Sequence, residues 1–213
     1  MSDFEPSSLL VLACGALARE IEWLKRTNAW QNISVQCLDA ELHNHPDRIP
    51  EKLEALIADN YGQFGQIFVA YGDCGTGGRI DKVLARWNIE RLPGAHCYSF
   101  YATEARFNSL AEAEPGTFYL TDFLVRHFDR LVIRGLKLDR HPQLLQDFFG
   151  HYQRVIYLAQ QDNDQLQLAA RRAADYLGLR FETLITGMGE LGQHLEKQVL
   201  NLQRNGGVQH AAH

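Results

Sequence analysis

A strand, a glycine-rich turn and a helix follow one another in residues 66–87, QIFVAYGDCGTGGRIDKVLARW. The apolar run 66–71 is typical of a buried strand, and the turn Gly72–Gly78 ends it. The helix that follows turns an apolar face to the core at Ile80, Val83, Leu84 and Trp87. The segment therefore predicts a strand that passes through a tight turn into a packed helix.

The same order of strand and helix recurs along the chain. Residues 8–14, 33–37, 155–159 and 181–185 are further predicted strands, and each precedes a segment with helical apolar spacing. Parallel neighbours need such crossover helices. We therefore expect an α/β fold with a mainly parallel sheet and helices on both faces. The expected layout is a single three-layer domain over residues 1–204, followed by a disordered tail over 205–213.

Composition narrows the class of protein. The 213 residues include 21 Lys and Arg against 26 Asp and Glu, which gives a net charge of −5 and argues against nucleic acid and anionic membranes as partners. The N-terminus carries Asp3 and Glu5 where a signal peptide would be basic, and the apolar run 9–13 is too short to cross a bilayer. We expect a soluble, cytoplasmic protein.

Cysteines occupy the predicted strand ends. Cys14 closes the first strand, Cys74 lies in the turn after the third, and Cys97 follows another Pro-Gly break. Ligands of parallel sheets bind at the carboxyl ends of the strands. A thiol that precedes a helix N-terminus is acidic, and thiolate is the form that binds metals and attacks electrophiles. Cys37 alternates within a strand, and we expect it in the core.

His43, after the second strand, is the imidazole candidate for the same edge. Cys14, Cys74, Cys97 and His43 would suit Zn²⁺, and an iron–sulfur cluster is the alternative cofactor. Free buried thiols also explain the three cysteines, because cysteine packs as a small hydrophobe. The backbone N–H groups of the glycine turn also suit a bound phosphate, although the turn lacks the lysine of a P-loop.

Three carboxylates are further catalytic candidates. Asp73 lies in the glycine turn, Asp122 follows an aromatic strand candidate, and Glu20 lies one turn into the first helix. Each could act as an acid or base or orient a histidine. Loop carboxylates more often cap helices, and Glu20 more often lies on the surface.

The segments VLACGALAREI, LHNHPDRIPEKL, YGDCGTGG, PGAHCY and PGTFYLTDF together resemble the prokaryotic family called domain of unknown function sixteen thirty-eight. The resemblance covers most of the chain and implies that Cys14, His43, Cys74 and Cys97 are motif residues. It also implies a role near corrinoid methyltransfer proteins, in methyl or one-carbon metabolism. The chain has no corrinoid-binding DxHxxG motif, so a partner or accessory enzyme is the role expected.

Three functions stay open from the sequence. The first is a thiolate-ligated zinc enzyme that acts on a small-molecule substrate in methyl or thiol chemistry. The second is a metal-binding or iron–sulfur accessory protein without turnover. The third is a metal-free enzyme with Cys14 or Cys74 as nucleophile and His43 or His96 as its base. A homodimer is also considered, because the last helix carries the apolar stripe Leu191, Leu195, Val199 and Leu202.

Overall fold

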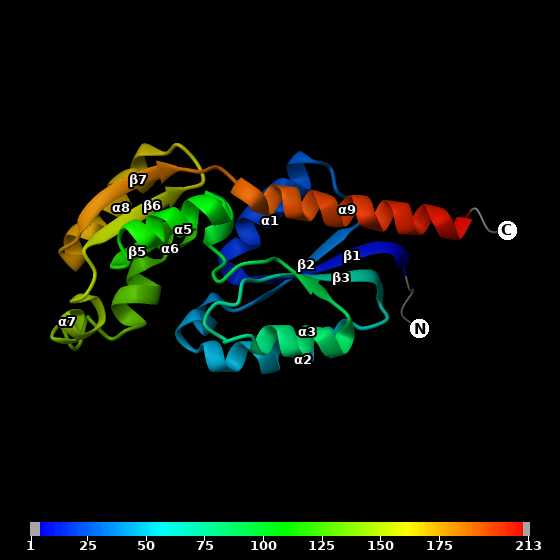
Figure 1. Cartoon of the computed structure of the whole chain (residues 1–213), viewed down its shortest axis with the longest axis horizontal. Helices are drawn as coiled ribbons and strands as arrows, with labels where there is room; N and C mark the ends of the chain where they lie inside the picture. Colours follow the sequence, from blue (N-terminus) through cyan, green and yellow to red (C-terminus); the bar gives the residue numbers. More distant parts are fainter. Residues whose placement is uncertain (1–4, 211–213) are drawn as a thin grey trace. The chain divides into compact units, whose positions relative to one another are not determined.

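The structure, a computed structural model, describes residues 5–210 of the chain, with side chains over 8–204. The described part divides into two compact units (Figure 1). Unit 1 contains the residues up to Cys97 together with those from Leu191 onward, and unit 2 contains Tyr98–Glu190. The chain therefore leaves unit 1 once, builds unit 2, and returns to unit 1 with its last helix.

Unit 1 is built on a parallel sheet of four strands in the order β2-β1-β3-β4. The strands are β1 (Glu5–Cys14), β2 (Ile33–Leu38), β3 (Phe64–Ala70) and the two-residue β4 (Glu90–Arg91). Central β1 is fully enclosed: Leu9, Leu10 and Val11 each have 0% of their surface exposed. A strand that is covered on both faces reads as a continuous apolar run, which explains the sequence LLVLAC.

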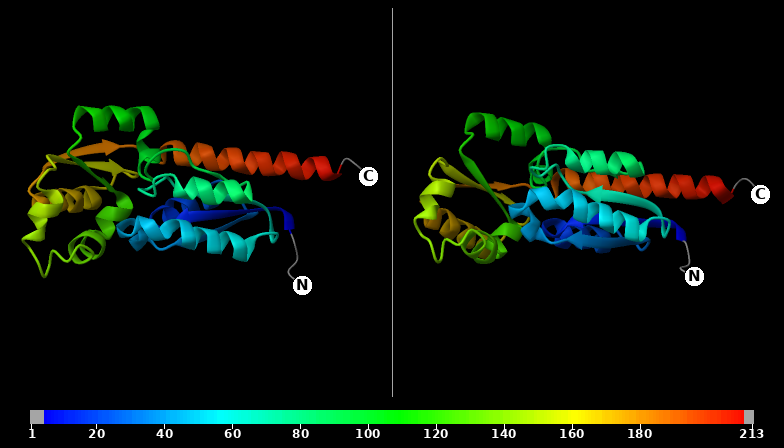
Figure 2. Two further views of the ribbon diagram at one scale, coloured as in Figure 1. Left: turned by 60° about the horizontal axis from the view of Figure 1, so that its bottom comes forward. Right: turned by 90° about the horizontal axis from the view of Figure 1, so that it is seen from below.

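Helices cover both faces of this sheet. As Figures 1 and 2 show, α2 (Ile49–Asn60) and α3 (Arg79–Trp87) lie on one face. The other face carries α1 (Ala18–Thr27) and α9 (Gly189–His210). The two are adjacent, because a Cβ added at Gly192 would lie 3.5 Å from Leu24 Cδ2. Short 3-10 turns occupy Gly15–Leu17, Ala40–Asn44 and Pro46–Arg48.

Unit 2 has its own parallel sheet of three strands in the order β5-β6-β7. These are β5 (Thr117–Thr121), β6 (Arg154–Ala159) and β7 (Arg180–Ile185). The helices of the unit are α4 (Ser99–Ala102), α5 (Glu104–Ala113), α6 (Asp122–Arg126), a π-helical turn (Asp129–Arg134), α7 (Leu144–Phe149) and α8 (Asp164–Leu177).

Two apolar clusters stabilise unit 2, one on each face of its sheet. Leu120, Val155 and Tyr157 pack with Ala170 and Ala174 of α8. The alternate strand residues pack against α4 and α5, and they are Tyr119, Ile156 and Leu158. The residues alternate in this way because successive side chains along a strand point to opposite faces of the sheet.

The α/β class and the parallel strands that the sequence predicts are confirmed, whereas the single sheet is wrong. The alternation of strands and helices predicts parallel pairing but does not say which sheet a strand joins. The expected disorder of the tail over 205–213 stays a prediction: α9 is drawn through His210, and residues 211–213 lie outside the described residues. The apolar stripe that suggested a dimer is buried in the core, as Leu191 and Leu195 show.

Over residues 5–210, no helix is both long and apolar enough to cross a bilayer.

Candidate functional site: a thiol cluster at the strand ends of unit 1

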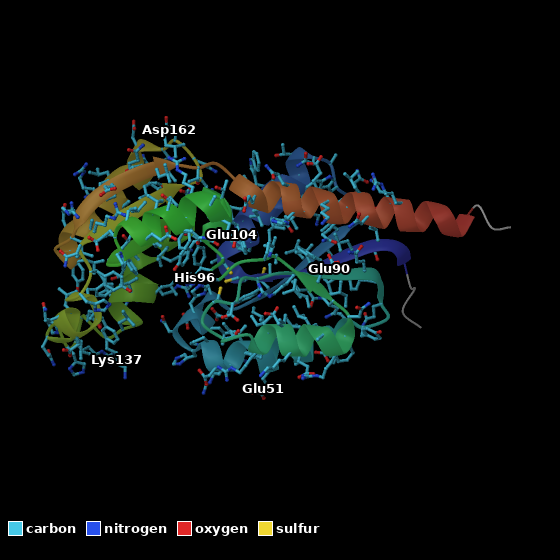
Figure 3. All side chains as sticks on the ribbon, in the orientation of Figure 1. Glu51, Glu90, His96, Glu104, Lys137 and Asp162 are labelled. Carbon is cyan, nitrogen blue, oxygen red and sulfur yellow. The ribbon has the colours of Figure 1, made fainter. Side chains whose placement is uncertain are left out.

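The carboxyl ends of β1, β2 and β3 meet at one edge of the unit 1 sheet, because the three strands are parallel and in register. Cys14, the last residue of β1, pairs with Leu38, the last residue of β2. Figure 3 labels His96 beside yellow sulfur atoms at this edge. Segments far apart in the sequence thus deliver their side chains to one place.

Cys14 and His43 form the first contact of this cluster, with 3.9 Å between Cys14 Sγ and His43 Nδ1. His43 lies in the 3-10 turn Ala40–Asn44, whose start is capped because the Asp39 carboxylate accepts the Glu41 N–H at 2.9 Å. Gly15 allows that turn to approach, since a Cβ there would lie 2.9 Å from the Leu38 carbonyl oxygen. Cys14 is buried and His43 is exposed.

Cys74 and Cys97 form the second contact, with 3.1 Å between their Sγ atoms. Both side chains are buried, and the Gly72 N–H donates to Cys97 Sγ at 3.3 Å. Gly72 has no room for a side chain, because a Cβ there would lie 2.8 Å from the carbonyl carbon of His96. The glycine turn therefore brings Cys74 against Cys97 through a close approach of two backbones.

The four side chains of the two contacts also influence one another's pKa values, so they form one cluster. Cys97 and then His43 lower the pKa of Cys14 well below its usual value, and the same two neighbours lower the pKa of Cys74 to about 5, against the effect of burial. The contacts with Cys14 and Cys74 raise the pKa of His43 to about 10. Hydrogen bonds to the same two cysteines, together with burial, raise the pKa of Cys97. These shifts favour the thiolate form at Cys14 and Cys74, the thiol at Cys97 and the protonated imidazole at His43 in the metal-free cluster.

Tyr71 is a fifth member that sequence reasoning missed. The residue follows β3 directly and is 0% exposed, and within the described part of the chain its hydroxyl makes no hydrogen bond of ordinary geometry. Burial and the neighbouring charge of Cys14 raise its pKa, and Cys97 and Cys74 add to the effect. A tyrosine at the carboxyl end of an otherwise apolar strand carries a polar tip into the core. That pattern is the signal that would have identified it.

Asp73 stabilises the glycine turn. Its carboxylate accepts hydrogen bonds from Thr76 Oγ1 at 2.7 Å, from the Gly78 N–H at 2.8 Å and from the Gly77 N–H at 3.0 Å. Burial opposes ionisation, but these donors lower the pKa of Asp73. The amides that a bound phosphate would need are thus already used by Asp73, which argues against phosphate binding at the turn.

Asp122 belongs to unit 2 and to a separate network. Its Oδ1 accepts hydrogen bonds from the Tyr157 hydroxyl at 2.7 Å and from the Gln160 N–H at 3.0 Å.

Glu20 is buried in α1, whereas a surface position was the more common expectation for this residue. Cys37 is exposed, so its expected place in the core is wrong. The physical reason is that β2 is an edge strand, and one side of an edge strand lacks a neighbour.

His96 lies next to the cluster, and burial lowers its pKa. Among the side chains described over 8–204, no group of three or more His, Cys, Asp or Glu is already arranged to hold an ion. The contact between Cys74 Sγ and Cys97 Sγ, at 3.1 Å, is shorter than the spacing of two sulfurs on one metal ion. Two sulfurs on one tetrahedral Zn²⁺ lie about 3.8 Å apart, given Zn–S bonds of about 2.3 Å.

Fold and site together define a class: an α/β protein with two parallel sheets, one of which carries three cysteines, a histidine and a tyrosine at its strand ends. Residues 37–195 match the family described as protein of unknown function (DUF1638), and the chain belongs to that family. The matched range includes His43, Cys74 and Cys97. No curated protein matches the chain, and no solved structure does.

Proposed function

We propose that Cys14, Cys74, Cys97 and His43 bind one Zn²⁺ ion, and that this centre belongs to an enzyme of thiol or methyl chemistry. The observation that supports the proposal is the convergence of these side chains at one sheet edge, with contacts of 3.9 Å and 3.1 Å. Three sulfurs and an imidazole are a donor set that zinc takes in proteins. Buried thiolates also need a compensating positive charge, which a divalent ion supplies.

Zinc would require Cys74 and Cys97 to move slightly apart. Cys74 Sγ and Cys97 Sγ, now 3.1 Å apart, would separate by about 0.7 Å to reach the spacing of two zinc-bound sulfurs. Cys14 and Cys74 already favour the thiolate form, because their pKa values are lowered. His43 and Cys97, whose pKa values are raised, would have to give up a proton, because metal ligands bind in their deprotonated forms.

The donors suggest the direction from which a substrate would enter. Cys14 and Cys97 are 0% and 2% exposed, whereas His43 is exposed. We therefore propose the His43 side as the place where a substrate would approach the ion. Soft sulfur ligands weaken the Lewis acidity of zinc, so an activated thiolate suits the centre better than activated water.

The small-molecule substrate, the cytoplasmic location and the corrinoid methyltransfer partners belong to this proposal as well. The family resemblance implies the methyl or one-carbon setting. The reduced thiols that the proposal needs are the normal state of cysteine in the cytoplasm.

A metal-free cysteine enzyme is the second candidate, and a specific observation favours it. Cys14 has a lowered pKa and lies 3.9 Å from His43 Nδ1, as expected for a nucleophile paired with its base. Alkylation distinguishes the two. Rapid labelling of Cys14 alone in metal-free protein, lost in His43→Ala, would support the nucleophile.

The test of the zinc proposal is elemental analysis with an absorption spectrum, on protein purified without oxygen and without added metal. We expect about one zinc per chain, lost in each of Cys14→Ser, Cys74→Ser and Cys97→Ser. Cys37→Ser is the matched control, because Cys37 is exposed and is not one of the proposed donors. Iron with sulfide would instead support a cluster and an accessory role. Protein without any metal, before and after zinc addition, would refute the proposal.

A further inference from the structure

Cys74 and Cys97 are brought together by the backbone, independently of a metal. The Asp73 N–H donates to the Gly94 carbonyl at 3.0 Å, and the Cys74 N–H donates to the Ala95 carbonyl at 2.7 Å. The two chain segments therefore run side by side into the cluster. The third bond, from the Gly72 N–H to Cys97 Sγ at 3.3 Å, fixes the sulfur itself.

The distance between Cys74 Sγ and Cys97 Sγ lies between that of a disulfide and that of two sulfurs bound to zinc. The Sγ atoms are 3.1 Å apart, whereas a disulfide requires about 2.05 Å and two zinc-bound sulfurs require about 3.8 Å. Closing the pair thus needs a movement of about 1 Å, which is similar in size to opening it for zinc. Cys14 differs, since it lies at the end of β1 and its Sγ is 3.9 Å from His43 Nδ1.

We propose that Cys74 and Cys97 form a reversible dithiol–disulfide pair that exchanges with low-molecular-weight disulfides. Cys74 is the more accessible of the two, with 7% of its surface exposed against 2% for Cys97. The Cys74 thiolate attacks one sulfur of the small disulfide, so that a mixed disulfide forms and one small thiolate leaves. Cys97 loses its proton to solvent and attacks Cys74 Sγ, which expels the second thiolate. The pair loses two electrons, and the small disulfide is reduced to two thiols.

Oxidation of the pair would also disable the metal site, and this consequence rests on the proposed function. Cys74 and Cys97 supply two of the four proposed zinc donors, and a disulfide sulfur is not a thiolate ligand. One exchange reaction would therefore release the ion. The protein would bind zinc only while the surrounding disulfide pool is reduced.

The experiment uses the full-length chain, freed of metal with a chelator and incubated with oxidised glutathione without oxygen. Intact mass and non-reducing peptide mapping follow the products. We expect a loss of about 2 Da and a peptide pair that links Cys74 to Cys97, both reversed by a dithiol. Cys14→Ser should still form the link. Cys97→Ser should stop at the mixed disulfide on Cys74, and Cys37→Ser is the matched control for an exposed cysteine.

Two results would overturn the inference: a link that joins Cys14 to either partner, or glutathione adducts without any internal link. Zinc is measured separately, before and after oxidation, so that the two proposals fail independently. A Cys74–Cys97 link in a protein that never binds zinc would refute the zinc proposal alone. Zinc that stays bound after the link has formed would refute the coupling between the pair and the metal site.

Discussion

Replacement of Gly72 by alanine tests the close approach on which the thiol cluster depends. The new Cβ would lie 2.8 Å from the carbonyl carbon of His96 and 3.0 Å from the nitrogen of Cys97. Gly72 is not among the glycines with positive φ, so alanine meets no backbone strain of its own there. The whole effect is therefore steric, and it acts on the segment that carries Cys97.

The magnitude follows from the atoms involved. Overpacking costs about 1–3 kcal/mol, and we expect the upper end, about 3 kcal/mol, because both obstructing atoms are backbone and cannot rotate away. In a chain of this length, that corresponds to a fall in Tm of about 6–12 °C. The segment His96–Cys97 must move, so the Gly72 N–H would lose Cys97 Sγ, and zinc uptake should weaken as well.

The assay is thermal unfolding followed by circular dichroism, in the presence of a chelator. Gly192→Ala in α9 is the matched control, since its Cβ would lie at an ordinary 3.5 Å from Leu24 Cδ2. Alanine in place of a helical glycine stabilises by about 0.5–1 kcal/mol. If Gly72→Ala unfolds at the same temperature as the unchanged protein, the close approach is not a constraint, and the account of how the cluster forms is refuted.

Three further predictions concern the charges and buried polar groups. In metal-free protein, the lowered pKa of Cys74, about 5 against an unfolded value of about 8.5, stabilises the fold at high pH, and this contribution is lost as pH falls through 5. The raised pKa of His43, about 10 against about 6.5, stabilises at low pH, and this contribution is lost as pH rises through 10. Cys14 has a lowered pKa like Cys74, and Cys97 has a raised pKa like His43. The urea midpoint should thus rise with pH to a maximum near about pH 8.5 and fall above it, and His43→Asn should weaken the alkaline fall. Tyr71→Phe removes a buried hydroxyl that makes no hydrogen bond of ordinary geometry among the described residues, so metal-free stability should stay level or rise by up to about 1 kcal/mol. A loss above about 2 kcal/mol in urea unfolding would contradict this. Asp122→Ala leaves a buried phenol and an amide unpaired in unit 2 and should cost about 2–4 kcal/mol by the same assay, while zinc content stays unchanged if the site is confined to unit 1.

The sequence predicted most of the elements that build the site. The strands that end at Cys14 and before Cys74 are where the apolar runs place them, since a buried parallel strand has to be apolar on both faces. Glycines after these strands identified the turns. His43 was found because it follows the second strand, and parallel strand ends share an edge.

Other features could not be predicted from the sequence, because they depend on contacts between distant segments. Periodicity reports which face of an element is buried but not the neighbour that buries it, so Cys37 on the edge strand β2 was misplaced. The buried positions of Glu20 and of the Tyr71 hydroxyl depend in the same way on packing. The division into two sheets is a further example, since strand order within a sheet leaves no local signature.

The sequence by itself determined the α/β class, the parallel pairing, and the edge at which cysteines and His43 gather, because these follow from local periodicity and from strand direction. Only the tertiary structure decided that Cys74 and Cys97 lie in contact while Cys14 faces His43. That pairing depends on how closely two backbones approach at Gly72, where the carbonyl carbon of His96 fills the space of the missing Cβ. Distances of this kind arise from long-range packing, and the order of residues along the chain does not encode them locally.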